Sequence, residues 1–306
     1  MKTAVLVLVG MILAAPSLAQ TAANASAAGK PLTAQQVVDR IKAHVGIPWM
    51  AQTRDTFKAG DPQTPVTGIA VTMMATMNVL ERAAANGQNL IITHEPTFFD
   101  DPDKAETVPQ GEQDPVLAEK RAFIEKHHLV IWRFHDHQHR MQLDQVEQGN
   151  ARKLGWEKYR DPANQYLFTL PETTLGKLAG EVKEQFGIAA IRIVGDRDMK
   201  VTRVALSPGF GGAKKEIAAL EMPGLEVLLV GETREWETVE YVADAVSQGR
   251  QKALIVLSHV PSEQSGAAEC VRWLKTFVNE LPIEFVATPD PFKEGAPLSK
   301  PQASCC

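Results

Sequence analysis

The 306-residue sequence has few cysteines, no basic block and no apolar run of the roughly 20 residues that a membrane span requires. Its three cysteines are Cys270 in a predicted helix and Cys305 and Cys306 at the C-terminus, which excludes a disulfide framework. The terminal pair fits a frayed tail, an intermolecular disulfide or a soft-metal site. The net charge of −5, without clustered lysine or arginine, excludes the basic footprint of a nucleic-acid-binding protein. We therefore expect small molecules or ions as partners, and neither nucleic acid nor a membrane.

An apolar run at the N-terminus is typical of a secretory signal. Lys2 supplies the positive charge, residues 4–16 the apolar core, and residues 17–19 a small-residue cleavage site. The residue directly after this cleavage site is Gln20 and not a cysteine, so a lipid anchor is not predicted. We expect residues 1–19 to be a signal peptide and residues 20–32 a flexible leader, and the mature protein to be secreted or periplasmic.

Alternating helix and strand patterns farther along the chain predict an α/β protein. Thr33 is suited to cap a helix over residues 34–45, whose apolar residues fall on one face. A strand, a helix and a strand follow as a βαβ unit, and the alternation then repeats. The same rhythm returns after Gly231. The predicted strands cover residues 66–75, 89–93, 129–134 and 253–258, and the predicted helices cover residues 75–87, 117–128, 236–249 and 262–278.

The intervening segment has a different rhythm and predicts a smaller α+β module. Short strands accompany a helix over residues 174–187. A turn at Gly209, Gly211 and Gly212 either accepts an anion, such as a nucleotide phosphate, or packs tightly. We expect a mixed or parallel sheet flanked by helices, with the small module inserted. The predicted parts are an α/β domain of residues 33–164 plus 231–287, an inserted module of residues 165–230 and a disordered tail of residues 288–306.

Three of the predicted strands end in side chains that commonly ligate metals. NLIIT leads into His94 and Glu95, LVIWRF into the HDHQH segment at residues 135–139, and ALIVLS into His259 and Glu263. Ligands of parallel α/β sheets collect at the carboxyl ends of the strands, so we expect the three clusters to share one edge of one sheet. The pattern predicts a metal site there. Taken singly, the first and third clusters also fit a hydrogen-bonded turn and a helix cap.

The HDHQH segment leaves the most alternatives open. If the segment is extended, His135, His137 and His139 share one face and Asp136 points the other way. Imidazoles suit zinc or iron, and carboxylates suit harder ions such as manganese. A His-rich tract is also typical of a surface scavenging site. We expect one or two of these side chains to hold or orient substrate instead of metal.

Longer motifs resemble a known family. These are GIAVTMMATMNVLERAAANGQNLIITHEP, GNARKLGW, the VGE at residues 230–232 and SHVPSE. They resemble the Nif-three-like dinuclear-metal proteins, which are also called GTP cyclohydrolase I type-two homologues. The resemblance runs from about Val66 to Leu274. It implies a Nif-three-like fold with a second domain, an assembly into ring-like hexamers, and metal ligands at His94, Glu95, His259 and Glu263.

The sequence departs from the family pattern at two places. The family usually has His-His-Pro where this chain has His94, Glu95 and Pro96. It usually has a histidine followed four residues later by aspartate, where this chain has His135 and His139. Asp136 preserves the carboxylate and His139 preserves the spacing. We take Asp136 as the fifth predicted ligand.

These features together predict an exported metal-dependent hydrolase that uses one or two divalent ions, such as zinc, iron or manganese. His135, His137 or His139 would act as general base or bind the leaving group of a small-molecule substrate. The alternative is a non-catalytic metal-binding or assembly protein of the periplasm, which the HDHQH tract favours. A third hypothesis treats the glycine turn at Gly209 as a nucleotide-phosphate site.

Overall fold

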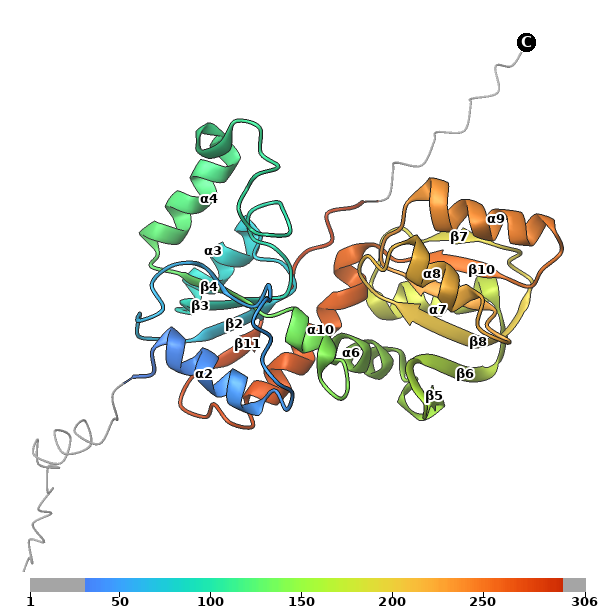
Figure 1. The fold of residues 1–306 in the computed structure, drawn as a ribbon, viewed down its shortest axis with the longest axis horizontal. Helices are drawn as coiled ribbons and strands as arrows, with labels where there is room; N and C mark the ends of the chain where they lie inside the picture. Colours follow the sequence, from blue (N-terminus) through green and yellow to red (C-terminus); the bar gives the residue numbers. More distant parts are fainter. Residues whose placement is uncertain (1–30, 294–306) are drawn as a thin grey trace, which may run out of the picture.

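The computed structural model describes residues 31–293, which form two β-sheets with two packed helices between them (Figure 1). The predicted signal peptide, almost all of the predicted leader, Cys305 and Cys306 lie outside the described residues. Within residues 31–293, no helix is both long and apolar enough to cross a bilayer. The predicted α/β fold with helix-flanked mixed sheets is confirmed.

The first sheet has the strand order β1-β4-β3-β2-β11. Its central strands are parallel, and all the residues of β2, β3 and β4 are buried, which explains their uninterrupted apolar sequences. The strands are β1 Phe57–Ala59, β2 Ile69–Thr72, β3 Leu90–Thr93, β4 Val130–Arg133 and β11 Ile283–Phe285.

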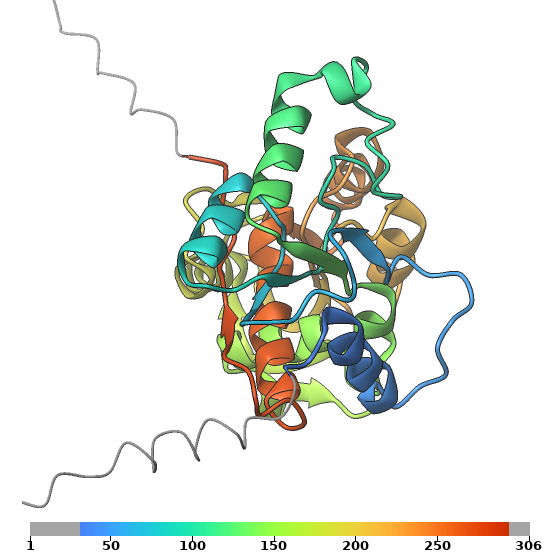
Figure 2. The ribbon, with the colours of Figure 1, turned by 90° about the vertical axis from the view of Figure 1, so that its left-hand side faces the viewer.

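Helices cover both faces of the first sheet (Figure 2). On one face lies α2, Ala34–His44, which begins at the predicted cap Thr33 with a reciprocal capping box to Gln36. The helix α10, His259–Leu274, packs beside it through Ala267, Cys270 and Leu274. The opposite face carries α3, Met77–Ala85, and α4, Pro115–Lys126, and a short 3-10 turn at Gly111–Gln113 precedes α4.

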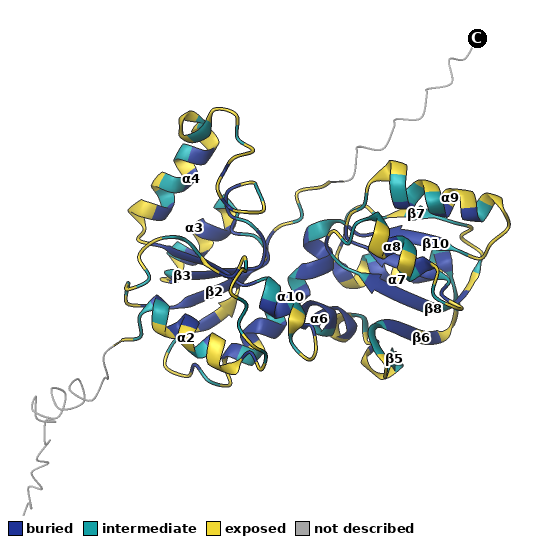
Figure 3. Ribbon diagram, in the orientation of Figure 1, coloured by how far each residue is buried: buried dark blue, intermediate teal, exposed yellow. Residues whose placement is uncertain are grey.

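The second sheet has the strand order β5-β6-β8-β9-β10-β7. Figure 3 shows the central strands of both sheets as buried. The helix α7, Leu175–Phe186, packs on one face, and α8, Ala213–Leu220, and α9, Glu240–Ser247, pack on the other. A π-helical turn, Glu235–Val239, leads into α9. The strands are β5 Arg160–Asp161, β6 Asn164–Thr174, β7 Arg192–Val194, β8 Lys200–Ser207, β9 Val227–Val230 and β10 Ala253–Val256, with a 3-10 turn at Glu157–Tyr159 before β5.

The position of β10 corrects one expectation from the sequence. It pairs in parallel with β9 and antiparallel with β7, so it belongs to the second sheet. The prediction that three strand ends share one edge of one sheet is therefore wrong. Helical periodicity and apolar runs predicted the helices and strands. They carry no information about which strands pair with each other in a sheet. Only α10 and β11 bring the chain after β10 back to the first sheet.

Two helices join the sheets. The helix α6, Gln145–Leu154, crosses α10 where two glycines meet the opposite backbone. A Cβ atom at Gly149 would lie 2.5 Å from the carbonyl carbon of Ser265, and one at Gly266 would lie 2.7 Å from Cγ2 of Val146. Both positions therefore require glycine, because any side chain would force the helices apart.

We expect Gly149→Ala to lower the free energy of unfolding by about 1–3 kcal/mol, the usual cost of overpacking a core. The matched control is Gly180→Ala in α7, where an added Cβ has no atom within 4 Å. That change should leave stability unaltered or raise it by up to about 1 kcal/mol, because alanine favours helix. Urea denaturation measures both. Equal effects of the two substitutions would contradict the close crossing.

Candidate metal centre

Side chains from three strand ends converge between the two sheets. His94 and Glu95 follow β3, His135 lies between β4 and α5, the helical turn Asp136–Arg140, and His139 lies within that turn. The first two turns of α10 add His259 and Glu263. Candidate ligand atoms of His94, His135 and His139 lie within 4.8 Å of one another, as do those of His94, Glu95 and Glu263. The strand ends thus meet, although they come from two sheets.

The carboxylate of Glu263 lies at the centre of the cluster. Its Oε2 is 3.0 Å from Nε2 of His259 and 3.5 Å from Nε2 of His94. Its Oε1 is 4.0 Å from Nε2 of His139. The Oε1 of Glu95 lies 3.5 Å from Nε2 of both His135 and His259. The Glu263 carboxylate therefore has an imidazole close to each of its two oxygens.

Three atoms of this cluster lack hydrogen bonds. Nε2 of His94, Nε2 of His259 and Oε2 of Glu263 are buried and have no hydrogen-bond partner within residues 31–293. The 3.0 Å between the last two atoms is short, but the pair does not have the alignment of a hydrogen bond. Buried polar atoms without partners cost free energy unless they coordinate a cation. The donor set of imidazole and carboxylate therefore fits a divalent metal.

The other ring nitrogen of each clustered histidine is held by an oxygen. Nδ1 of His94 lies 2.8 Å from Oε1 of Gln138, and Nδ1 of His139 lies 2.9 Å from Oδ2 of Asp144. Nδ1 of His259 lies 3.0 Å from Oε1 of Glu232. These partners fix each ring with Nε2 toward the cluster, as the outer partners of metal-binding histidines do. Asp136 does the same for His135, at 2.9 Å.

Burial and charge divide the histidine pKa values. Burial lowers the pKa of His94 to about 4, so its imidazole is neutral, as a ligand must be. Burial also opposes the charged form of His139 and His259, but the carboxylates close to each ring outweigh it. Asp144 raises the pKa of His139 to about 9, and Glu232, Glu263 and Glu95 raise that of His259 to about 12. The carboxylates therefore attract positive charge into the cluster.

Asp136 does not face the cluster. Its Oδ2 accepts hydrogen bonds from Oγ1 of Thr53 at 3.0 Å and from the backbone N of Arg54 at 2.7 Å, while its Oδ1 pairs with His135. The structure therefore differs from the prediction of Asp136 as the fifth ligand and brings His135 and His139 into the cluster instead. The reason is local conformation, because residues 136–140 are helical and positions four apart share a face.

His137 lies in the core and not in the cluster. Its ring stacks on Trp49 with centroids 3.6 Å apart, and the side chain is fully buried. Nδ1 pairs with Oδ2 of Asp55 at 2.6 Å, and Nε2 accepts a hydrogen bond from the backbone N of Met50 at 3.0 Å. Neither nitrogen is left for a substrate. Of the three histidines predicted to be catalytic, the structure brings His135 and His139 to the site.

Asp55 is a supporting residue that the sequence pattern did not indicate. Its Oδ1 accepts hydrogen bonds from the backbone N of His135 at 2.6 Å and of Asp136 at 2.9 Å. Its Oδ2 accepts from the backbone N of His137 at 2.9 Å. It thus caps α5 from a segment about 80 residues away in the sequence. A cap supplied from so far away leaves no local motif.

The glycine turn at Gly209 lies against the cluster. A Cβ atom at Gly209 would lie 2.7 Å from the carboxyl carbon of Glu263, and its φ of +63° also favours glycine. Its backbone N donates a hydrogen bond to Oγ of Ser262 at 3.0 Å. Of the two interpretations of this turn, the structure supports close packing.

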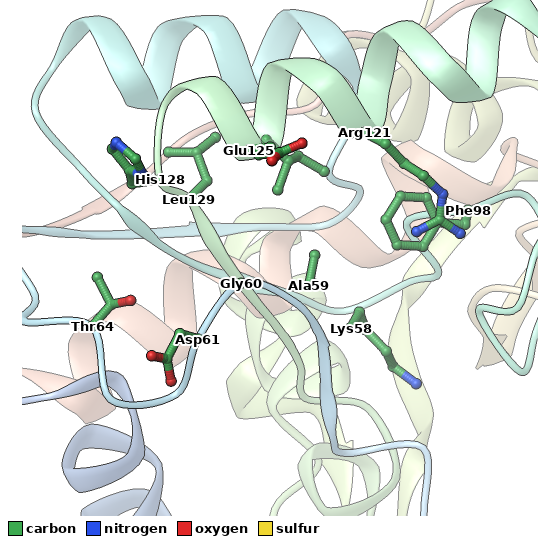
Figure 4. A pocket seen from close by; sticks show the side chains of 11 residues that line it. Lys58, Ala59, Gly60, Asp61, Thr64, Phe98, Arg121, Glu125, His128 and Leu129 are labelled. Carbon is green, nitrogen blue, oxygen red and sulfur yellow. The ribbon is translucent and has the colours of Figure 1, made fainter. Parts of the chain in front are cut away.

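A separate pocket of about 390 Å³ lies under α4 (Figure 4). Arg121 and Glu125 line it from α4, His128 from the turn that follows α4, and Lys58 and Gly60 from the segment around β1. The guanidinium of Arg121 lies 4.2 Å from the ring centroid of Phe98. No side chain of the candidate metal cluster lines this pocket.

The fold and cluster define a two-sheet α/β protein whose His and Glu side chains are compatible with divalent-metal binding. The profile of the family described as Duf34/NIF3 (NGG1p interacting factor 3) matches residues 32–291. The chain belongs to this family, and the resemblance stated from its motifs is confirmed.

Individual relatives agree with this assignment. A Clostridium acetobutylicum protein named GTP cyclohydrolase 1 type 2 homolog is 27% identical over 200 residues, which cover 60% of this chain and 68% of that protein. A crystal structure of a Bacillus cereus protein related to NIF3 has a TM-score of 0.66 at 16% identity, covering 87% of this chain and 100% of that one. A Staphylococcus aureus hypothetical protein has a TM-score of 0.65 at 18% identity, covering 86% and 99%. These structures share the fold.

We expect Asp55→Ala to lower the free energy of unfolding by about 2–3 kcal/mol, because it leaves three buried or half-buried backbone donors of α5 without their acceptor. The control is Asp61→Ala, which removes an exposed carboxylate that accepts one hydrogen bond from Gln63 within its own turn. Chemical denaturation of both variants measures the difference. Matching losses in the two variants would show that Asp55 has no special role in holding α5.

Proposed function

We propose that the protein is an exported, divalent-metal-dependent hydrolase. The proposed ligands are His94, Glu95, His139, His259 and Glu263. The observation that carries the proposal is the set of buried, unpartnered atoms on His94, His259 and Glu263, all directed at one another. Such an arrangement is unfavourable in an empty protein and favourable around a cation.

Two features favour a site for two ions over a site for one. The two oxygens of Glu263 face different imidazoles, so this carboxylate could help to hold more than one ion. The five proposed ligands are also more than one four-coordinate ion needs. Two divalent ions with the carboxylates of Glu95 and Glu263 and neutral imidazoles would leave a formal charge of about +2. That charge favours an anionic or strongly polar substrate group.

When bound, the ions would polarise the substrate and lower the pKa of a water molecule toward neutrality. Arg133 holds the Glu95 carboxylate through Oε2 at 3.1 Å, which leaves Oε1 directed toward His135 and His259. Gln138 holds the ring of His94 through Nδ1. These contacts fix the donors before substrate arrives, so little reorganisation accompanies the reaction.

We assign proton transfer to His135. Its Nδ1 pairs with Oδ1 of Asp136, and Arg54 Nη1 lies 3.2 Å from that same oxygen. This pairing fixes the tautomer that leaves the Nε2 lone pair facing the cluster, where it can take a proton from water and return it to a leaving group. The side chain of His135 is 22% exposed, against 4% for His94, so a substrate can reach it.

The substrate class follows from this charge and from the name of the curated relative. Phosphoesters, amides and ring amidines all present a polar group that a site of charge about +2 can polarise. The relative's name points to ring-opening hydrolysis among these. Export rests on residues 1–19 and assembly into a homo-oligomeric ring rests on the family resemblance, and both belong to the proposal.

Purified protein should carry one or two divalent ions per chain, and the double variant His94→Ala/His259→Ala should carry none, because each substitution removes a central ligand. Inductively coupled plasma mass spectrometry measures the stoichiometry. His127→Ala, an exposed histidine at the end of α4, is the control and should keep the wild-type metal content. Metal-free wild-type protein, or a double variant that retains its metal, would overturn the metal site.

The metal-loaded protein should hydrolyse members of an ester, phosphodiester and cyclic-amide panel. We expect His135→Gln to keep its metal and to lose turnover by about 100-fold or more, the usual contribution of a general base. Glu95→Gln should lose turnover, whereas Glu119→Gln, an exposed carboxylate on α4, should not. Absence of turnover from fully loaded protein would favour the non-catalytic metal-binding alternative. Loss of metal in His135→Gln would make His135 a ligand.

A further inference from the structure

A second pocket, of about 320 Å³, lies where α6 and α10 meet the end of β11. Figure 1 shows these elements at the junction between the two sheets. Its walls carry Arg152 and Lys153 from α6, and Gln264, Ser265 and Arg272 from α10, with Phe285 of β11 at one side. Pockets of this size accept small organic molecules. None of the proposed metal ligands lines it.

The charged wall of this pocket is incompletely neutralised. Arg152 and Arg272 share one carboxylate, Glu269, whose oxygens lie 2.8 Å and 3.0 Å from their Nε atoms. Arg152 also reaches Glu157 at 3.4 Å. Lys153 has no carboxylate within ion-pair distance among the residues that the structure describes, and its ammonium lies 5.4 Å from the ring centroid of Phe186. Three cations therefore stand against two carboxylates.

The pocket also contains hydrogen-bonding groups without partners. Ser265 is 8% exposed, and its Oγ is buried with no hydrogen-bond partner within residues 31–293. Oε1 of the neighbouring Gln264 lacks a partner in the same way. The Ser265 hydroxyl can donate to an anion, whereas Oε1 of Gln264 only accepts and can bind a donor group of the same ligand or a water molecule. Buried groups of this kind are rarely left unpaired in a folded protein, so a ligand or water is needed there.

We propose that this pocket binds a small organic anion, with its carboxylate or phosphate group between Lys153 and Ser265 and its apolar part against Phe285. Lys153 supplies the unpaired charge, and the Ser265 hydroxyl supplies a hydrogen bond. The aromatic ring of Phe285, which is 37% exposed, and Ala287 supply the apolar contact. The bound anion would touch α6, α10 and the first sheet together.

The pocket lies close to the candidate metal centre but is separate from it. Gln264 and Ser265 directly follow Glu263 in α10, and α6 begins after Asp144, the partner of His139. An anion in the pocket would therefore stabilise the packing of the two helices that support the candidate metal ligands. Its own contacts involve no ligand residue, so binding should be independent of metal.

The test is isothermal titration calorimetry with the full chain, as purified and after treatment with a chelator. The probes are phenyl phosphate, benzoate and inorganic phosphate, with benzylamine as the cationic counterpart. We expect saturable binding of at least one anion with one site per chain, equal affinity with and without metal, and no binding of benzylamine. The first two probes distinguish a phosphate from a carboxylate ligand, and inorganic phosphate shows the contribution of the apolar part.

Lys153→Met should weaken the binding about tenfold or more, the effect of losing one charge-assisted hydrogen bond. Ser265→Ala should weaken it severalfold without destabilising the protein, because the hydroxyl has no internal partner. Lys158→Met is the matched control, since this exposed lysine lies over Tyr159 and outside the pocket, and it should bind normally.

Three results would each overturn the proposal. They are no saturable binding of any of the anions, binding that disappears on chelation, and wild-type affinity in Lys153→Met. The titration of chelator-treated protein also distinguishes failure of this proposal from failure of the proposed hydrolase. The pocket should bind its anion even in protein that has no metal.

Discussion

The buried carboxylate of Glu263 is the constraint on which the candidate site depends. It is surrounded by imidazoles and cannot be hydrated, so it needs positive charge close by. Burial alone would lower the pKa of His259. The three carboxylates that face its ring outweigh this effect and raise the pKa to about 12. The carboxylates around His139 and His259 raise the pKa of both rings, so imidazolium is one source of that charge. A divalent ion would supply it without a proton, which is why a cluster of this composition favours metal over apolar packing.

Some side chains of the cluster are positioned by residues nearby in the sequence, and others by residues far away in the sequence. His259 and Glu263 are four residues apart on α10, so helix geometry alone brings their side chains together. His135 and His139 have the same spacing on α5, but this short helix depends on Asp55 for its cap. The two pairs thus share one spacing, and they differ in what holds the helix in place. A helix of five residues has too few internal hydrogen bonds to be stable alone.

Much of this fold was predictable from local pattern. Buried strands such as β3 and helices such as α2 follow from apolar runs, periodicity and the Thr33 cap. The long-range features were not. Strand order depends on tertiary pairing, so the place of β10 was wrong. The roles of Asp136 and His137 depended on whether residues 135–140 are extended or helical, and Asp55, which decides it, lies far away in the sequence. His94 and Glu95 follow a strand, and His259 begins a helix with Glu263 one turn later, so their closeness could be expected from the sequence.

The close crossing of α6 and α10 connects the two sheets and the candidate metal centre between them. Gly149 and Gly266 let the backbones touch, so neither helix can move along the other without loss of contact. At its first turns α10 carries His259 and Glu263, and farther along it packs on the first sheet through Leu274. A single helix therefore brings two candidate ligands, which follow the second sheet, close to the candidate ligands at the end of the first sheet. The site can lie between two sheets and still be well defined, because its halves share this helix and do not rely on a flexible linker.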